Sequence, residues 1–168
     1  MGKPGGAKTN INGLNFEKET HFFKMIKEHK EYTIKNNGEI FKNELFVGEY
    51  FDKSELYTKL LKKLKINYKD FLSKKNIPDG VFYVGRKVFI IEKKFQIIQG
   101  SVDEKLQTCD FKKKQYEKLF KPLGIDVEYY YILNDFFKKE CYNDVFEYIK
   151  SVGCKYFFDT LPLDVIDL

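Results

Sequence analysis

Residues 78–94 read PDGVFYVGRKVFIIEKK, and this stretch decides the fold of the chain. Two apolar runs flank a Gly-Arg pair at positions 85–86, which predicts a β-hairpin with a two-residue turn. Glycine supplies the positive φ that the first turn position needs. With this turn, the register places Asp79 directly opposite Glu92, and opposed side chains on antiparallel strands have Cβ atoms about 5 Å apart. Lys94, two residues after Glu92, projects from the same face.

Two carboxylates held that close repel each other, and a divalent cation relieves the repulsion. Oxygen ligands suit Mg²⁺, and a lysine beside them steadies an attacking water and the charge that builds on a phosphate. Asp79 and Glu92 are therefore candidate metal ligands, and together with Lys94 they predict a phosphodiester-cutting site. Taken singly, Asp79 also fits an ordinary Pro-Asp-Gly turn, and Glu92 also fits a strand end that emerges into solvent.

Pro-Asp, a spacer and Glu-x-Lys resembles the PD-(D/E)xK nuclease superfamily, which includes most type II restriction endonucleases. The resemblance covers residues 12–135, where an acidic helix, a hairpin, a helix and a strand are expected in that order. It implies an α/β fold with a restriction-endonuclease-like core, in which a mixed central sheet is flanked by helices on both faces. It also implies Mg²⁺-dependent cleavage of DNA that leaves 5′-phosphates, with Mn²⁺ as a substitute. Lys94 matches the lysine that orients or helps to deprotonate the hydrolytic water.

The resemblance further implies a catalytic, metal-binding glutamate on the first helix. Glu17 matches best and Glu19 is the alternative. An acid in the first turn that compensates the helix dipole is the other explanation that the sequence allows. Gln96 continues the face of Glu92 and Lys94, so it is a candidate DNA contact or a plain polar strand end.

Lysines supply the remaining candidate DNA contacts. Lys112, Lys113 and Gln115 lie on the helix expected after the hairpin. Residues 53–75 hold eight lysines against two acids. Lys62 and Lys63 are the candidate DNA contacts chosen from this stretch. It is either a surface that follows phosphates or a solvated helix face.

Length and composition predict one domain over residues 13–168, preceded by a flexible basic arm over 1–12. The resemblance implies that this domain is nuclease-like. Residues 1–125 carry 26 basic and 16 acidic side chains, whereas residues 126–168 carry 4 and 9, so a polyanion partner is expected. The resemblance implies that this partner is double-stranded DNA. Three cysteines without a C-x-x-C pair indicate reduced thiols in a soluble intracellular protein. No stretch has the length of a membrane span. The sequence contains no P-loop motif, so no nucleotide cofactor is expected.

The expected elements alternate along the chain. Helices are predicted over residues 14–30, 54–65, 101–120 and 136–151. Two strands are predicted within 31–51, around the hairpin signal Asn36-Asn37-Gly38, and further strands are predicted at 80–96, 127–133 and 154–158.

The function predicted first is site-specific cleavage by a homodimer, as in a compact type II restriction enzyme. A Holliday-junction resolvase or a phage-type recombination nuclease has comparable size and is the alternative within nucleases. A non-catalytic nucleic-acid-binding module with a nuclease-like core is the alternative from another class.

Overall fold

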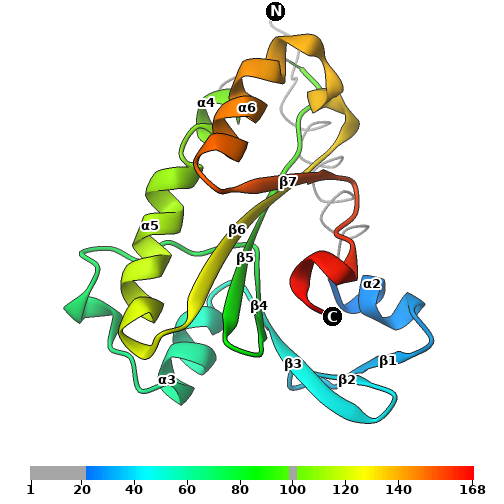
Figure 1. Ribbon diagram of the computed structural model, residues 1–168, viewed down its shortest axis with the longest axis vertical. Coiled ribbons are helices and arrows are strands. Elements are labelled where there is room, and N and C mark those ends of the chain that lie inside the picture. Colours follow the sequence, from blue (N-terminus) through cyan, green and yellow to red (C-terminus); the bar gives the residue numbers. More distant parts are fainter. Residues whose placement is uncertain (1–21, 99–101) are drawn as a thin grey trace, which may run out of the picture.

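The computed structural model describes residues 22–98 and 102–168. Within them the chain forms one seven-stranded sheet, ordered as in the sequence from β1 to β7 (Figure 1). The strands are β1 (Tyr32–Ile34), β2 (Glu39–Lys42), β3 (Leu45–Asp52), β4 (Gly80–Val84), β5 (Lys87–Lys94), β6 (Asp126–Leu133) and β7 (Lys155–Phe158). The expected arm 1–12 and both candidate helix acids, Glu17 and Glu19, lie outside the described residues.

The β4–β5 hairpin has the register that the sequence predicts. Gly80 pairs with Ile91, and the pairing continues to the residues that flank the Gly85-Arg86 turn. Gly85 has a φ of +58°, which glycine adopts at little cost. The β4–β5 ribbon therefore ends in a closed turn at one end and an open pair of strands at the other.

The sheet is mixed, because β1 to β5 pair antiparallel and β5, β6 and β7 pair in parallel. Parallel neighbours need a crossover connection. The helices α4 (Val102–Leu106) and α5 (Cys109–Phe120) connect β5 to β6, and α6 (Asn143–Ser151) connects β6 to β7. In Figure 1, α4 and α5 stand to the left of the sheet and α6 lies at the top, above β7, whereas α2 (Phe22–Glu28) lies to the right.

Two hydrophobic clusters cover the two faces of the sheet. Side chains alternate between the faces of a strand, so Val88 and Ile90 on β5 join the cluster that contains the α5 and α6 residues. Phe89 and Ile91 join the cluster that contains the α2 residues and the C-terminal residues Leu161, Leu163 and Ile166. The predicted α/β class, a mixed sheet with helices on both faces, is confirmed at this level.

Residues 31–51 form three strands where two were predicted. The predicted turn at Gly38 is present, but a second turn lies at Asn43 and Glu44, which have φ values of +47° and +69°. Such φ values are uncommon for residues with side chains, and no glycine marks this turn. The hairpin signal at Asn36-Asn37-Gly38 therefore predicted only the first of the two reversals.

The helices are more interrupted than the periodicity predicts. The helix expected over 54–65 is a π-helical stretch, Leu56–Leu60, followed by α3 (Leu61–Lys63). The helix expected over 101–120 breaks between α4 and α5, and α6 begins only after two 3₁₀ turns within 135–142. Within the described part of the chain, no helix has both the length and the apolar character that spanning a membrane requires.

Candidate functional site

The candidate site lies where β4 ends short of β5. The last pair joins Gly80 to Ile91, and β5 then continues beside β6 alone. The backbone N–H of Lys93 donates to Oδ2 of Asp79 at 2.7 Å. The N–H of Asp79 in turn donates to the carbonyl of Ile91 at 3.1 Å. Main-chain contacts therefore fix a carboxylate at the open end of the hairpin.

Glu92 is a buried carboxylate at the end of an apolar strand, with only 5% of its surface exposed. Its Oε2 accepts a hydrogen bond from Nζ of Lys94 at 2.7 Å, and its Oε1 accepts one from Nζ of Lys112 on α5 at 3.1 Å. Burying a carboxylate is costly unless it is paired and hydrogen-bonded. Two ammonium groups offset that cost here.

The ammonium group of Lys94 connects the two carboxylates electrostatically. It also donates to the carbonyl of Lys93 at 3.2 Å. Burial raises the pKa of Asp79 above its ordinary value, and the charge of Glu92 acts in the same direction, whereas the N–H of Lys93 and the charge of Lys94 lower it. Glu92 and Lys94 thus both act on the charge state of Asp79.

Two tyrosines anchor the segment that leads to Asp79. Tyr57 donates to the carbonyl of Asn76 at 2.8 Å and accepts from its N–H at 3.0 Å. Tyr116 on α5, predicted as a core residue and fully buried, donates to the same carbonyl at 2.9 Å. Burial raises the pKa of Tyr57 to about 12 and that of Tyr116 above its usual range, so both hydroxyls remain donors.

Sequence reasoning missed the part that Tyr57 plays in this anchor. The signal was present, because a buried tyrosine hydroxyl usually finds a hydrogen-bond partner. What the sequence does not indicate is that this partner lies 19 residues away, in the loop before the motif.

The oxygen atoms at the open end of the hairpin suit a hard divalent cation. The Lys94 ammonium already occupies a cation position between Oε2 of Glu92 and the carbonyl of Lys93, and Asp79 approaches Lys93 from the β4 side. Mg²⁺ is usually bound through one or two carboxylates and keeps several waters. Asp79 and Glu92 would supply those carboxylates.

The described residues place no third carboxylate in a group with these two. Within residues 22–98 and 102–168, no three His, Cys, Asp or Glu side chains form a group that could hold a metal ion. Glu17, the third predicted ligand, lies outside these ranges. The two-carboxylate arrangement is therefore the one that the described residues offer.

Gln96 is buried just beyond the motif, with 4% of its surface exposed. Its Nε2 donates to the carbonyl of Ile98 at 2.7 Å. Its main chain is held by the side chain of Asn134, through contacts of 3.1 and 2.8 Å. A contact between Gln96 and DNA stays a prediction, and the visible role of this residue is to fix the exit of β5.

The candidate contacts on α5 separate into different environments. Lys112 joins the site through Glu92, as described above. Lys113 instead donates to the carbonyl of Gly153 at 2.9 Å, at the end of α6. Gln115 is half-buried on the same helix. Only Lys112 among them is brought to the carboxylates.

Lys62 and Lys63 lie exposed on α3, near the other end of the hairpin. Lys63 forms an ion pair with Glu49, which pairs across the sheet with Tyr83, close to the β4–β5 turn. The structure therefore does not bring these two lysines to the carboxylate site, and their contact with DNA stays a prediction.

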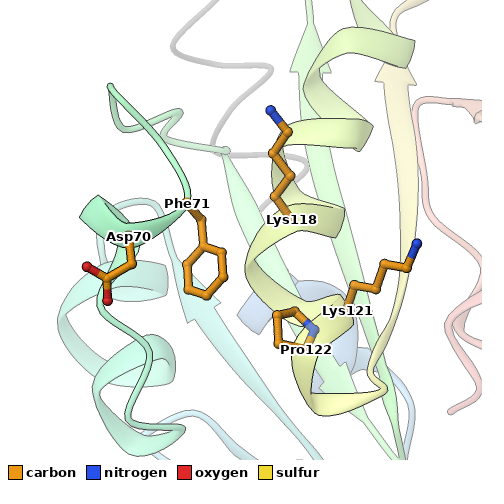
Figure 2. A pocket seen from close by; sticks show the side chains of 5 residues that line it. All are labelled: Asp70, Phe71, Lys118, Lys121 and Pro122. Atoms are coloured by element: carbon orange, nitrogen blue, oxygen red, sulfur yellow. The ribbon is translucent and has the colours of Figure 1, made fainter.

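A surface groove of about 490 Å³ lies elsewhere, between the 3₁₀ turn Tyr68–Asp70 and the end of α5 (Figure 2). Figure 2 shows the rings of Phe71 and Pro122 on opposite sides of it. The groove is lined by Asp70, Phe71, Lys118, Lys121 and Pro122. None of the predicted site residues lines it, so it is separate from the carboxylate site.

Comparison with known proteins gives no match: no family model, no curated protein and no solved structure matches the chain.

Proposed function

We propose that the chain is a Mg²⁺-dependent nuclease that hydrolyses phosphodiester bonds of double-stranded DNA. The observation that supports this most strongly is the grouping of Asp79, Glu92 and Lys94 at the open end of one hairpin. Buried ionisable groups whose pKa is shifted by burial and by a specific charge partner are typical of functional sites. Asp79 has such a shift, and Glu92 is buried with two charge partners.

Each residue of the site has a distinct role in this reaction. Mg²⁺, when bound, would polarise the phosphate and lower the pKa of a bound water. Asp79 and Glu92 would hold it with oxygen ligands, and the N–H of Lys93 orients Asp79 for that purpose. Lys94 would position the attacking water and offset the negative charge that builds on the phosphate.

The balance of the reaction is simple hydrolysis. The oxygen of water forms a new bond to phosphorus as the P–O3′ bond breaks. One proton of the water ends on the O3′ leaving group, so the products are a 3′-hydroxyl and a 5′-phosphate. No oxidant, reductant or nucleotide is consumed.

The charge of the chain supports a polyanionic substrate. The net charge is +5, and 26 of the 30 basic side chains belong to residues 1–125, which include the site. The charges of Asp79 and Glu92 are matched locally by Lys94 and Lys112. The acidic pair therefore presents little net repulsion to an approaching phosphate backbone.

We further propose that the enzyme resembles a type II restriction endonuclease that acts as a homodimer on a short site. The order α2, β4–β5 hairpin, α5, β6 is the order that the resemblance implies, and it supports this proposal. A junction resolvase would use the same group of residues, so the choice of DNA substrate separates the two readings.

The decisive experiment incubates the purified chain with plasmid DNA, long linear DNA and a four-way junction, with and without Mg²⁺. Discrete fragments from the duplexes indicate site-specific cutting, and preferential cutting of the junction indicates resolution. Asp79→Ala and Glu92→Ala should each abolish cleavage and leave DNA binding largely intact. Asp70→Ala, which changes an exposed acid outside the site, is the matched control and should cleave as the wild type does.

Two outcomes would contradict the proposal. Cleavage by Asp79→Ala at the wild-type rate would remove this site from consideration. DNA binding by the wild type without cleavage of any of these substrates, in Mg²⁺ or Mn²⁺, would instead favour the non-catalytic binding module.

A further inference from the structure

Two ammonium groups share the one buried carboxylate of Glu92, and they are held differently. Lys94 lies on β5 and has a second acceptor, the carbonyl of Lys93. Lys112 reaches back from α5, and Oε1 of Glu92 is its only hydrogen-bond acceptor in the described part of the chain. The Lys112 side chain is also the more exposed, at 26% against 17% for Lys94. Lys112 is therefore the easier of the two to release.

The balance of charge at the site predicts which ammonium group a bound metal would displace. Without a metal, Lys94 and Lys112 match the two negative charges of Asp79 and Glu92. A divalent cation held by these carboxylates would add two positive charges beside both ammonium groups, and like charges this close repel. The ammonium group with the single contact would leave first. A DNA phosphate next to the site offers it a new anionic partner.

Given the metal-dependent nuclease proposed above, we propose that Lys112 is an exchangeable cation of the site. It occupies Oε1 of Glu92 in the metal-free protein, and it moves to a phosphate oxygen of the substrate once a metal and DNA are bound. The buried carboxylate is thereby never left unpaired. A purely structural ion pair would instead keep Lys112 on Glu92 throughout.

The test measures binding of Mn²⁺ alone, without DNA, by isothermal titration calorimetry on the full chain. Two cations that compete for one carboxylate are coupled, so Lys112→Met should bind Mn²⁺ about tenfold more tightly than the wild type. Lys114→Met is the matched control, because Lys114 pairs with Asp110 on the exposed side of the same helix. It should leave the Mn²⁺ affinity unchanged.

A second measurement tests the transfer of the Lys112 ammonium group to a phosphate oxygen of the DNA. At saturating Mn²⁺, Lys112→Met should cleave DNA about 100-fold more slowly, because a cation that stabilises the phosphate is lost. Lys112→Gln, which keeps an N–H donor for Oε1 but not the charge, should show both effects and guards against misfolding of the methionine variant. Circular dichroism melts establish that each variant is folded.

The outcomes separate the exchange from the nuclease activity itself. Unchanged or weaker Mn²⁺ binding by both folded Lys112 variants would overturn the exchange and leave the proposed function standing. Tighter Mn²⁺ binding with an unchanged cleavage rate would overturn the transfer to the phosphate. A wild-type protein that neither binds Mn²⁺ nor cleaves DNA would overturn the proposed function together with the exchange.

Discussion

The open end of the β4–β5 hairpin and the lysine-rich segment 53–75 are both charged, but they hold their charges in opposite ways. At the hairpin, Glu92 is buried and paired with two ammonium groups, one of them delivered by a distant helix. In the segment, all eight lysines are exposed. The ion pair of Lys59 with Glu55 lies at the surface, and Lys63 is likewise exposed, although its partner Glu49 is only 13% exposed.

The burial of a charged group is therefore a better indication of function than the local density of charges. An exposed ion pair contributes little free energy, because water solvates its partners almost as well. A buried carboxylate is costly to maintain, and replacing a buried ion pair with apolar residues is often neutral or stabilising. The pairing at Glu92 is therefore harder to explain by stability alone than the density of lysines at 53–75.

The largest expected difference between the two regions is in the rate of cleavage. Lys94→Ala should lower the single-turnover rate by about 10²–10³-fold, because it removes a cation next to the reacting phosphate. Lys62→Ala should change that rate less than about twofold, because salt screens an exposed charge far from the chemistry. Quenched-flow cleavage at saturating protein measures both. Equal losses of cleavage rate in the two variants would show that the buried and the exposed lysines contribute alike to the reaction.

The sequence predicted the hairpin well because its determinants are local. The Gly85-Arg86 turn and the two apolar runs set the register, and the register brought Asp79 and Glu92 to the same end. The sequence left open whether Glu92 is buried or lies at a strand end that emerges into solvent, and the structure shows it buried. The parallel pairing of β5 with β6 agrees with the helix expected between them, but the sequence analysis predicted only that the sheet is mixed.

Residues that meet over long sequence distances could not be predicted in the same way. Lys112 reaches Glu92 from 20 residues away, and nothing local on α5 distinguishes it from Lys113, which turns to Gly153. The lysines at 53–75 looked equivalent to those on α5 by charge alone. Their distance from the carboxylates depends on how β3 and α3 pack against the hairpin, which charge density does not indicate.

Tyr57 links the two regions, since it belongs to the lysine-rich segment and holds the loop before Asp79. Tyr116→Phe removes one hydrogen bond to the carbonyl of Asn76 and should lower the free energy of unfolding by about 1 kcal/mol. Tyr57→Phe removes its bond to that carbonyl and the bond that it accepts from the N–H of Asn76, so it should lower the free energy of unfolding by about 2 kcal/mol. The double variant leaves that carbonyl without either donor and should lose about 3 kcal/mol. Urea denaturation measures these losses.

The matched control is Tyr83→Phe on β4, a half-buried tyrosine whose hydroxyl has no hydrogen bond within the described residues. It should leave stability nearly unchanged. The double variant should also cleave DNA more slowly than Tyr83→Phe, because Asp79 follows the anchored loop by three residues. A double variant with wild-type stability and rate would show that the two tyrosine hydroxyls do not support the site.

The smallest expected effect concerns the cost of keeping Asp79 charged. Burial raises the pKa of Asp79 in the folded protein above its ordinary value of 3.8. Between those two pKa values the folded state binds more protons than the unfolded state, so this residue's contribution to stability falls as the pH rises through that window. Asp79→Asn has no charge to bury, and its amide oxygen can still accept from the N–H of Lys93.

We therefore expect Asp79→Asn to be at least as stable as the wild type at pH 7, with an advantage that shrinks as the pH is lowered toward 4, while its cleavage activity is lost. Urea denaturation from pH 4 to pH 8 measures the difference, and Asp70→Asn, at an exposed position, should show no such pH trend. An Asn variant that is less stable than the wild type at pH 7 would mean that the ionised Asp79 stabilises the fold. The open end of the hairpin would then resemble the lysine-rich segment, with charges kept for stability rather than for chemistry.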